Sequence, residues 1–271
     1  MRCAPVCRGN SVRRRGSARR ACRTAERGLQ SFPQLEVMFE SAAAGLPLPP
    51  ALAAAYGGVL SLPADCLVTN FVESVDGVVA FPDAGGESGG IVSGGSEADR
   101  FLMGLLRACA DAVLIGAGTL RAARNDLWFP ESIFPGAAPS FAETRRALGL
   151  RERPTLYVVT GSGRIDPDHP ALREGAVVLR GKLEPHEIVA TLRRDGRRRI
   201  LCEGGPGLFA ELAAARLVDE MFLTLSPRLF GRWPGDARKA LTEKRDLAGA
   251  PLELLSLRRH GSHLFLRYRC R

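Results

Sequence analysis

Long hydrophobic runs are absent from this 271-residue chain. No apolar stretch reaches the roughly 18 residues that a membrane-spanning helix needs. The longest weakly apolar stretch, residues 42–62, is interrupted by Pro47, Pro49 and Pro50, and proline in a helix interior removes a hydrogen bond and bends the helix. A signal-peptide pattern is also missing. The sequence therefore predicts a cytoplasmic protein with no membrane partner.

Motifs of nucleophilic and metal-dependent catalysis are missing as well. The chain has four histidines and contains no H-E-x-x-H, no G-x-S-x-G and no Walker loop. Its seven cysteines are odd in number and irregularly spaced, which favours reduced thiols. Cys3 and Cys7 have the spacing of half a metal site, but no second pair completes it. We therefore expect no bound metal and assign no catalytic side chain from the sequence.

Lysine is scarce, since arginine outnumbers it 35 to 3. The formal net charge is +9, but residues 1–25 contain eight arginines and no acid, which leaves +1 for residues 26–271. A globular nucleic-acid-binding protein carries its excess charge on a folded face, so we expect no nucleic-acid partner. Residues 1–30 are predicted to be a disordered Arg-rich tail, and Met38 is a candidate for the true start. Residues 31–63 are interpreted as a lead-in segment.

From residue 64 onward, apolar strand patterns alternate with amphipathic helix patterns. Strands are predicted over 66–72, 78–81, 111–115, 155–160, 176–179, 199–203, 219–227, 252–259 and 262–269. Helices are predicted over 96–109, 144–150, 185–194 and 207–215, with irregular segments at 83–95 and 128–140. This order predicts an α/β domain over residues 64–271, with a mostly parallel central sheet flanked by helices and an antiparallel C-terminal hairpin.

Two glycine-rich turns follow predicted strands and open helices. The first follows Glu203 and comprises residues 204–206, and the second comprises residues 116–119. Glycine lets the backbone approach a ligand closely, and the N–H groups and dipole at a helix N-terminus attract phosphate. Alone, the turn at 204–206 is explained as well by a tight bend as by a ligand site, and the turn at 116–119 is better explained by a helix cap. Together they favour a dinucleotide site.

Polar residues also interrupt the apolar patterns. Asn70 lies within a predicted buried strand, where its amide must be hydrogen-bonded. Asp76 and Gly77 predict a hairpin turn. Arg107 lies near the end of an apolar-faced helix, either as a solvated last-turn cation or as a ligand-binding group. A phosphate-bearing cofactor with few acids or bases around it favours hydride transfer, in which the cofactor supplies the chemistry.

These groups, in this order, resemble the reductase domain of bacterial riboflavin biosynthesis enzymes, the RibD C-terminal type, whose fold is similar to dihydrofolate reductase. The resemblance covers about residues 64–269 and is carried by the stretches 70–77, 93–94, 105–119, 200–206, 217–220 and 225–231. It implies NADPH as hydride donor, a homodimer, and a small-molecule substrate such as 5-amino-6-(5-phosphoribosylamino)uracil.

The resemblance also implies roles by position. The cofactor would be held by Thr119, Thr160, Gly204, Gly205, Pro206, Gly207, Leu208 and Phe209. The substrate would be held by Arg107, Glu203, Asn70 and Asp76. In that assignment the Arg107 guanidinium suits the substrate phosphate, and the Glu203 carboxylate suits a pyrimidine N–H or a ribose hydroxyl.

The chain departs from the family in two places. It lacks the His-Ala-Glu and Pro-Cys-x-x-Cys zinc motifs of the deaminase in bifunctional members, so deamination is not predicted. Residues 121–127 replace the common Asp-Asp-Pro-x-Leu. One alternative is dihydrofolate or pteridine reduction on the same fold, which relies on a buried carboxylate of the first helix. Glu97 and Asp99 are the acids of that helix, and both lie in its first turn. Dihydrofolate or pteridine reduction therefore ranks second. A non-catalytic NADPH-binding protein is a further alternative.

Overall fold

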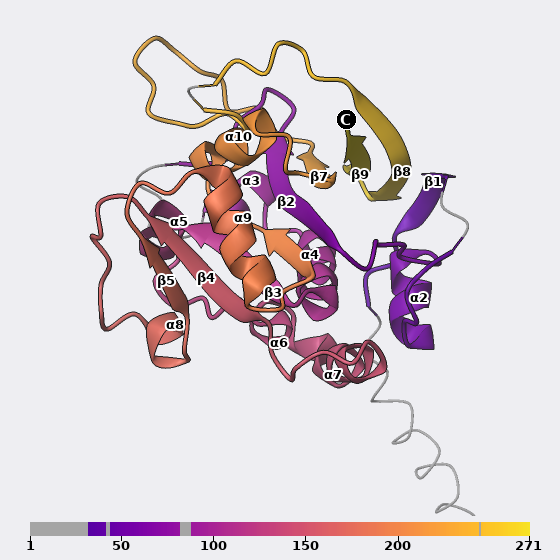
Figure 1. Ribbon diagram of the computed structural model, residues 1–271. Helices are drawn as coiled ribbons and strands as arrows, with labels where there is room; N and C mark the ends of the chain where they lie inside the picture. The colour runs from indigo at the N-terminus through magenta and orange to yellow at the C-terminus, as the bar shows by residue number, and fades with distance from the viewer. Residues whose placement is uncertain (1–31, 42–43, 82–87, 244) are drawn as a thin grey trace, which may run out of the picture. The chain divides into compact units, whose positions relative to one another are not determined.

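The computed structural model describes residues 32–41, 44–81, 88–243 and 245–271. The predicted tail, residues 1–30, and the Cys3–Cys7 pattern lie outside these ranges. The described residues form one sheet of nine strands in the order β1-β8-β9-β7-β2-β6-β3-β4-β5 (Figure 1). The carboxyl ends of its parallel strands meet at one edge, which is where ligands bind in sheets of this kind.

Six adjacent strands, β7-β2-β6-β3-β4-β5, are parallel to one another. Their bounds are β2 Cys66–Ser74, β3 Ala112–Gly116, β4 Thr155–Thr160, β5 Val177–Arg180, β6 Arg199–Cys202 and β7 Glu220–Ser226. The hairpin of β8 (Leu252–His260) and β9 (His263–Cys270) is antiparallel, and β9 adds to β7. This arrangement confirms the predicted sheet, parallel at its centre with an antiparallel C-terminal hairpin.

Helices cover both faces of this sheet. Their bounds are α2 Pro50–Tyr56, α3 Ser88–Ser93, α4 Glu97–Cys109, α5 Ala117–Ala122, α6 Pro130–Ile133, α7 Ala138–Ala147, α8 Pro170–Arg173, α9 Pro185–Arg194 and α10 Pro206–Ala214, with a 3-10 turn at Pro135–Ala137. In Figure 1, α9 and α10 lie in front of the strands. One core cluster packs α4 on one face, and another packs α9 and α10 on the other.

The apolar run of β2 explains why both faces are covered. Leu67 and Val68 are both buried, yet successive side chains of a strand point to opposite faces. Leu67 joins the cluster that contains α9 and α10, and Val68 joins the cluster that contains α4. A strand buried on both faces has a continuous hydrophobic run rather than an alternating one, as the sequence has here.

Three local predictions were wrong. Residues 88–93, expected within an irregular segment, form α3 because the Ser88 hydroxyl bonds to both the N–H and the C=O of Phe81, at 3.1 and 2.9 Å. Within residues 128–140, α6 and the start of α7 replace the expected irregular chain. Residues 78–81 make one antiparallel bridge, from Ala80 to Lys239, instead of a strand paired with β2.

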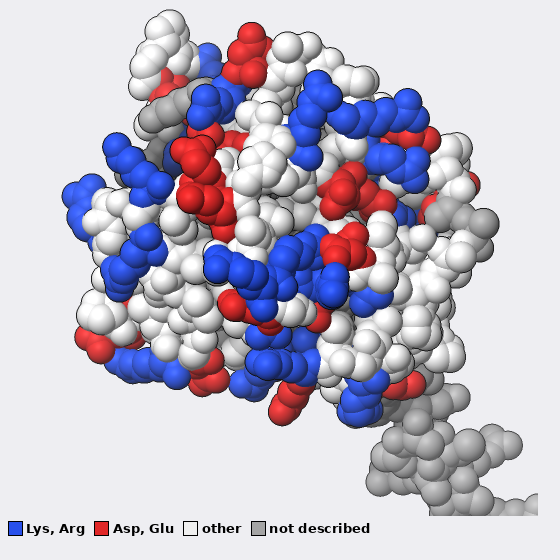
Figure 2. All heavy atoms as spheres, viewed as in Figure 1, with Lys and Arg blue, Asp and Glu red and all other residues white. Residues whose placement is uncertain are grey.

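The lead-in segment contributes to the same sheet and core. It supplies the edge strand β1 (Glu36–Glu40), paired antiparallel with β8, and the buried side chains of Leu52 and Tyr56 from α2. In the part of the chain that the structure describes, no helix is both long and apolar enough to cross a bilayer. On the face shown in Figure 2, basic and acidic side chains lie next to one another. This mixture agrees with the net charge of +1 calculated for residues 26–271.

Candidate active site

A cavity of about 540 Å³ opens at the edge where parallel strands β2, β3 and β6 end. Asn70 lines it from β2, Gly116 from the end of β3, and Glu203 from the residue after β6. The helices α4, α5 and α10 add side chains and N-terminal backbone to its wall. The two glycine-rich turns predicted from the sequence therefore border one cavity.

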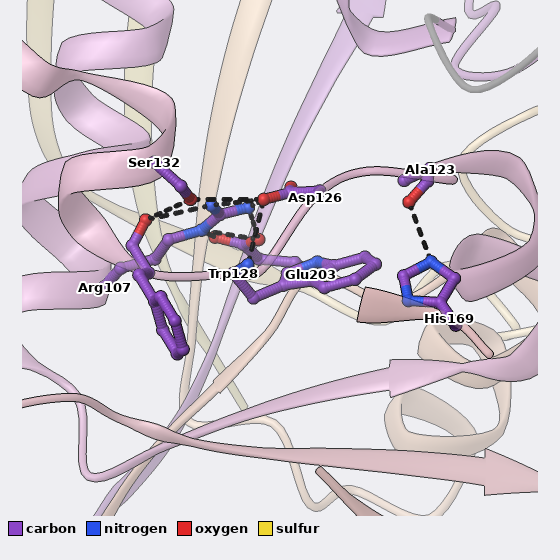
Figure 3. Close-up of polar contacts among 8 residues, drawn as sticks. Arg107, Ala123, Asp126, Trp128, Ser132, His169 and Glu203 are labelled. Carbon is purple, nitrogen blue, oxygen red and sulfur yellow. Dashed lines mark hydrogen bonds and ion pairs between the residues drawn. The ribbon is translucent and has the colours of Figure 1, made fainter. Parts of the chain in front are cut away.

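A buried ion cluster forms one wall of the cavity (Figure 3). Arg107, in the last turn of α4, is 1% exposed, and its Nη2 lies 2.7 Å from Glu203 and 3.0 Å from Asp126. Its Nε donates to both Glu203 oxygens, and its Nη1 donates to Asp126 and to the carbonyl of Phe129. All five N–H groups of the guanidinium therefore have protein acceptors.

The charges of this cluster support one another. Burial would lower the pKa of Arg107, but Glu203 and Asp126 outweigh it and raise the pKa above its usual value. Burial would likewise raise the pKa of Asp126, yet the neighbouring guanidinium holds it below the usual range. Burial raises the pKa of Glu203, and Arg107 opposes that shift. One cation shared by two acids leaves the cluster with a surplus of negative charge.

The turn after β6 is built around the backbone of β3. A Cβ on Gly204 would lie 2.3 Å from the Cα of Ile115, so a side chain cannot fit there. Gly205 has φ of +25°, and its N–H donates to the Thr119 hydroxyl at 2.8 Å. That hydrogen bond joins the two glycine-rich turns. The Thr119 hydroxyl keeps its own proton to donate elsewhere.

The space beside these turns suits a phosphate-bearing group. A Cβ added to Gly116 or Gly207 would meet nothing within 4 Å, and both residues line the cavity. The helix α10 begins at Pro206, and the N–H groups of Gly207 and Leu208 have no acceptor among the described residues. A helix N-terminus with free N–H groups next to open space can hold an anion.

One ridge of α4 faces the cavity. Asp99, Met103 and Arg107 follow one another at a spacing of four and all line it. Asp99 is 5% exposed, and burial raises its pKa to about 6, although Thr224, His263 and Arg100 act to lower it. A carboxyl group with such a pKa can hold and release a proton near neutral pH.

Asn70 has unused hydrogen-bonding capacity in the same cavity. It is 6% exposed, and its Oδ1 has no partner among the described residues. An unpaired buried amide oxygen is costly, so the Asn70 Oδ1 has the capacity to accept a hydrogen bond from a group in the cavity.

A strained residue lies beside the ion cluster. Trp128 is buried and has φ of +56°, which is rare for a bulky side chain. Its N–H donates to Asp126 at 2.9 Å, and its ring lies 6.1 Å from that of His169, whose Nε2 is 3.1 Å from the carbonyl of Ala123 (Figure 3). Backbone strain of this kind is typical of ligand sites.

The structure brings eight of the twelve predicted site residues to this cavity. They are Asn70, Arg107, Thr119, Glu203, Gly205, Pro206, Gly207 and Leu208. Four are not among the lining residues. Gly204 packs on β3, Phe209 packs on Phe71 at 5.1 Å, and the Thr160 hydroxyl accepts the Gly163 N–H. Asp76 accepts hydrogen bonds from Ser74, Phe230 and Gly231, which tie its turn to a later loop.

Asp126 is not among the residues predicted from the sequence, and Asp99 was considered only for the second-ranked function. Asp126 lies in the segment 121–127 that departs from the family pattern, and it supplies the second carboxylate to Arg107. Asp99 was judged by its place in the first turn. Its spacing of eight from Arg107 is the signal that would have placed both on one helix face.

Comparison with known proteins gives the family. Residues 66–266 match the model of the RibD C-terminal domain. The chain belongs to this family. A curated relative, the riboflavin biosynthesis protein RibD of Mycobacterium tuberculosis, is 30% identical over 162 residues, which are 59% of this chain and 42% of the relative. The match therefore spans less than half of the relative's length.

Solved structures show the same fold. A pyrimidine reductase-like protein of Corynebacterium diphtheriae has a TM-score of 0.61 at 21% identity and covers 81% of this chain and 98% of its own. RibD of Acinetobacter baumannii has a TM-score of 0.60 at 19% identity, over 82% of this chain and 60% of its own. The predicted fold class, an α/β domain with a mostly parallel central sheet, flanking helices and an antiparallel C-terminal hairpin, is confirmed.

Proposed function

We propose that this protein is an NADPH-dependent reductase of a phosphoribosylaminopyrimidine, of the type 5-amino-6-(5-phosphoribosylamino)uracil, in riboflavin biosynthesis. The observation that carries the proposal is the single cavity that joins the N-terminus of α10 to Glu203 and Asn70. One side of that cavity suits the phosphates of a dinucleotide, and the other presents polar groups to a heterocycle. The names of the relatives, RibD and pyrimidine reductase-like protein, support the same reaction.

The cofactor side follows from the glycine positions. Thr119 and the free N–H groups of Gly207 and Leu208 would hold a phosphate, in open space that a side chain at Gly207 would fill. NADPH bound there would supply the hydride. Thr160, Gly204 and Phe209 remain part of the proposal as residues that support the cofactor site from outside the cavity lining. Gly204 does so by setting the close packing of this turn on β3.

The substrate side follows from the polar groups. Asn70 would exchange hydrogen bonds with the pyrimidine, and Glu203, held by Arg107, would accept from an N–H or a ribose hydroxyl. Asp76 would act from a distance by fixing its turn. Opening the ribose to a ribityl chain adds a hydride to the anomeric carbon and a proton to the former ring oxygen. Asp99, buried in the cavity with a pKa of about 6, is the group able to supply that proton.

The test is a substrate panel with purified protein. NADPH oxidation is followed at the nicotinamide absorbance band with three candidate substrates. They are 5-amino-6-(5-phosphoribosylamino)uracil, the corresponding pyrimidine before deamination, and dihydrofolate. We expect turnover of an aminopyrimidine. In parallel, Gly205→Val should weaken NADPH binding, measured by calorimetry, because it places a branched side chain at a positive φ beside Thr119. Unchanged NADPH affinity in that variant would contradict the cofactor turn.

Dihydrofolate or pteridine reduction is the second candidate function. Asp99 favours it, because that reaction needs a buried carboxylate on the first long helix and Asp99 occupies such a place. Turnover of dihydrofolate alone would select this function over the first. Binding of NADPH without turnover of any substrate in the panel would instead support the non-catalytic alternative.

A homodimer, which the family resemblance implies, and a cytoplasmic location, which the sequence predicts, are part of the same proposal. Sedimentation velocity of the full chain would show a species of about twice the 29.1 kDa chain mass. A monomer at micromolar concentration would contradict the assembly without bearing on the reaction.

A further inference from the structure

The cavity has three cationic side chains among the described residues that line it: Arg100, Arg107 and Lys239. Arg107 has no free N–H, since Glu203, Asp126 and the Phe129 carbonyl accept all of them. A phosphate that approached Arg107 would have to displace a buried carboxylate at 2.7 or 3.0 Å. The anionic end of a substrate therefore needs a different cation.

Lys239 is placed at the cavity by its backbone. It lies in the long connection between β7 and β8, and its N–H donates to the carbonyl of Ala80 at 3.0 Å. Its carbonyl accepts the N–H of Val79 at 2.9 Å, which completes an antiparallel bridge. Its ammonium has no ion pair or hydrogen bond within the part of the chain that the structure describes. Among the described residues, no acid competes with a ligand for the charge of Lys239.

Arg100 is the second available cation. It lies in the first turn of α4, and only its Nη1 has an acceptor, the Gly95 carbonyl at 3.1 Å. Arg100 and Lys239 both line the cavity. Long, flexible cationic side chains can extend toward one phosphate bound there.

We propose that Lys239, assisted by Arg100, binds the phosphomonoester of the substrate and so determines its preference for a phosphorylated ribose. The inference rests on the proposed reduction and concerns the substrate end of the same cavity. Glu203 and Asp126 form their ion pairs with Arg107 rather than with Lys239 or Arg100. Arg100 also acts on Asp99, whose pKa it lowers, so Lys239 is given the main role and Arg100 the assisting one. An ammonium on a flexible stem suits phosphate, which offers acceptor oxygens in several directions.

The experiment compares KM and kcat for the phosphoribosylaminouracil and for its dephosphorylated counterpart at saturating NADPH. Lys239→Met should raise KM about tenfold or more for the phosphorylated substrate, which is the loss expected for one charge-assisted contact. KM for the dephosphorylated substrate should change by less than about twofold, and kcat should be kept for both. Lys239→Arg should restore most of the affinity. Lys182→Met, at an exposed lysine outside the cavity, is the matched control and should equal the wild type.

An equal effect of Lys239→Met on both substrates, or no effect on either, would overturn the subsite. A second measurement separates this outcome from failure of the proposed function. Binding of ribose 5-phosphate and of ribose is measured by calorimetry, without turnover. If no aminouracil is reduced but ribose 5-phosphate binds and Lys239→Met abolishes that binding, the reaction is wrong and the subsite stands. If the aminouracil is reduced and Lys239→Met matches the wild type, the reaction stands and the subsite is wrong.

Discussion

Replacing Arg107 by methionine should destabilise the fold in a way that depends on pH. Methionine keeps much of the length of the side chain and removes the guanidinium that Glu203 and Asp126 share. Both acids are then left without their cation, at 6% and 24% side-chain exposure. Removal of one partner from a buried ion pair costs about 3–5 kcal/mol, and the partial exposure of Asp126 favours the lower half of that range. This is a large part of the about 5–15 kcal/mol that stabilises a typical domain.

The pH dependence follows from the two carboxyl groups. In the wild type, Arg107 lowers the pKa of Asp126, so this contact stabilises the fold above the unfolded pKa and is lost as the pH falls through the folded pKa. In the variant, burial raises the pKa of Glu203 with no cation to oppose it. A raised carboxyl pKa destabilises the fold more as the pH rises. The Asp126 contact is already complete at pH 5, because the unfolded pKa of aspartate is about 3.9. The Glu203 effect still grows between pH 5 and pH 7, so it makes the difference between wild type and variant larger at pH 7 than at pH 5.

Urea unfolding followed by far-UV circular dichroism at both pH values measures this difference. Adding Glu203→Gln to Arg107→Met should recover part of the stability at pH 7, because the buried group is then neutral. Arg145→Met is the matched control. Arg145 is equally buried but donates to the carbonyls of residues 107, 108, 110 and 151 rather than to a carboxylate, so its loss should be similar at both pH values. A loss below about 1 kcal/mol, or an equal loss at both pH values, would refute the reasoning.

Three further predictions concern single contacts. Gly204→Ala should destabilise the fold by more than about 2 kcal/mol, since its Cβ would meet Ile115 at 2.3 Å, whereas Gly207→Ala should change thermal stability little. Ser96→Ala should cost about 1 kcal/mol in urea unfolding, because its hydroxyl caps the Asp99 N–H at 3.3 Å. The rate of reduction should fall as the pH rises above about 6, where Asp99 loses its proton, and Asp99→Asn should remove that dependence.

The sheet could be predicted from the sequence because its strands are continuous apolar runs. β3, β4 and β6 each carry such a run, followed by glycine or a polar turn, and β2 carries a mainly apolar run interrupted by Thr69 and Asn70. These runs are a local signal. The short helices could not be predicted in the same way. α3 contains Gly89 and Gly90, which disfavour a helix, and is fixed by a hydrogen bond to Phe81 that exists only in the folded chain.

The residues of the candidate site also fall into two groups, those that a local sequence pattern could predict and those that only the fold brings together. Glu203, Thr119 and Gly205 lie in turns that adjoin strands, so their local pattern was enough to bring them together. Asp126 reaches Arg107 from 19 residues away, and Lys239 reaches Ala80 from a distant loop. No periodicity connects such pairs, and only the folded backbone places them at one cavity.

Helix α4 shows how one sequence pattern carries two different roles. Asp99 and Arg107 lie on the same ridge, two spacings of four apart, and both are almost fully buried. Arg107 is surrounded by acceptors, so its charge is used to hold Glu203 and Asp126 in place. Asp99 forms no ion pair among the described residues, and burial moves its pKa toward neutrality although Thr224, His263 and Arg100 act to lower it. We therefore expect environment rather than residue type to make Arg107 a positioning group and Asp99 a proton donor. If Asp99→Asn keeps the wild-type rate at pH 7, the proton must come from elsewhere, and the second of these roles is wrong.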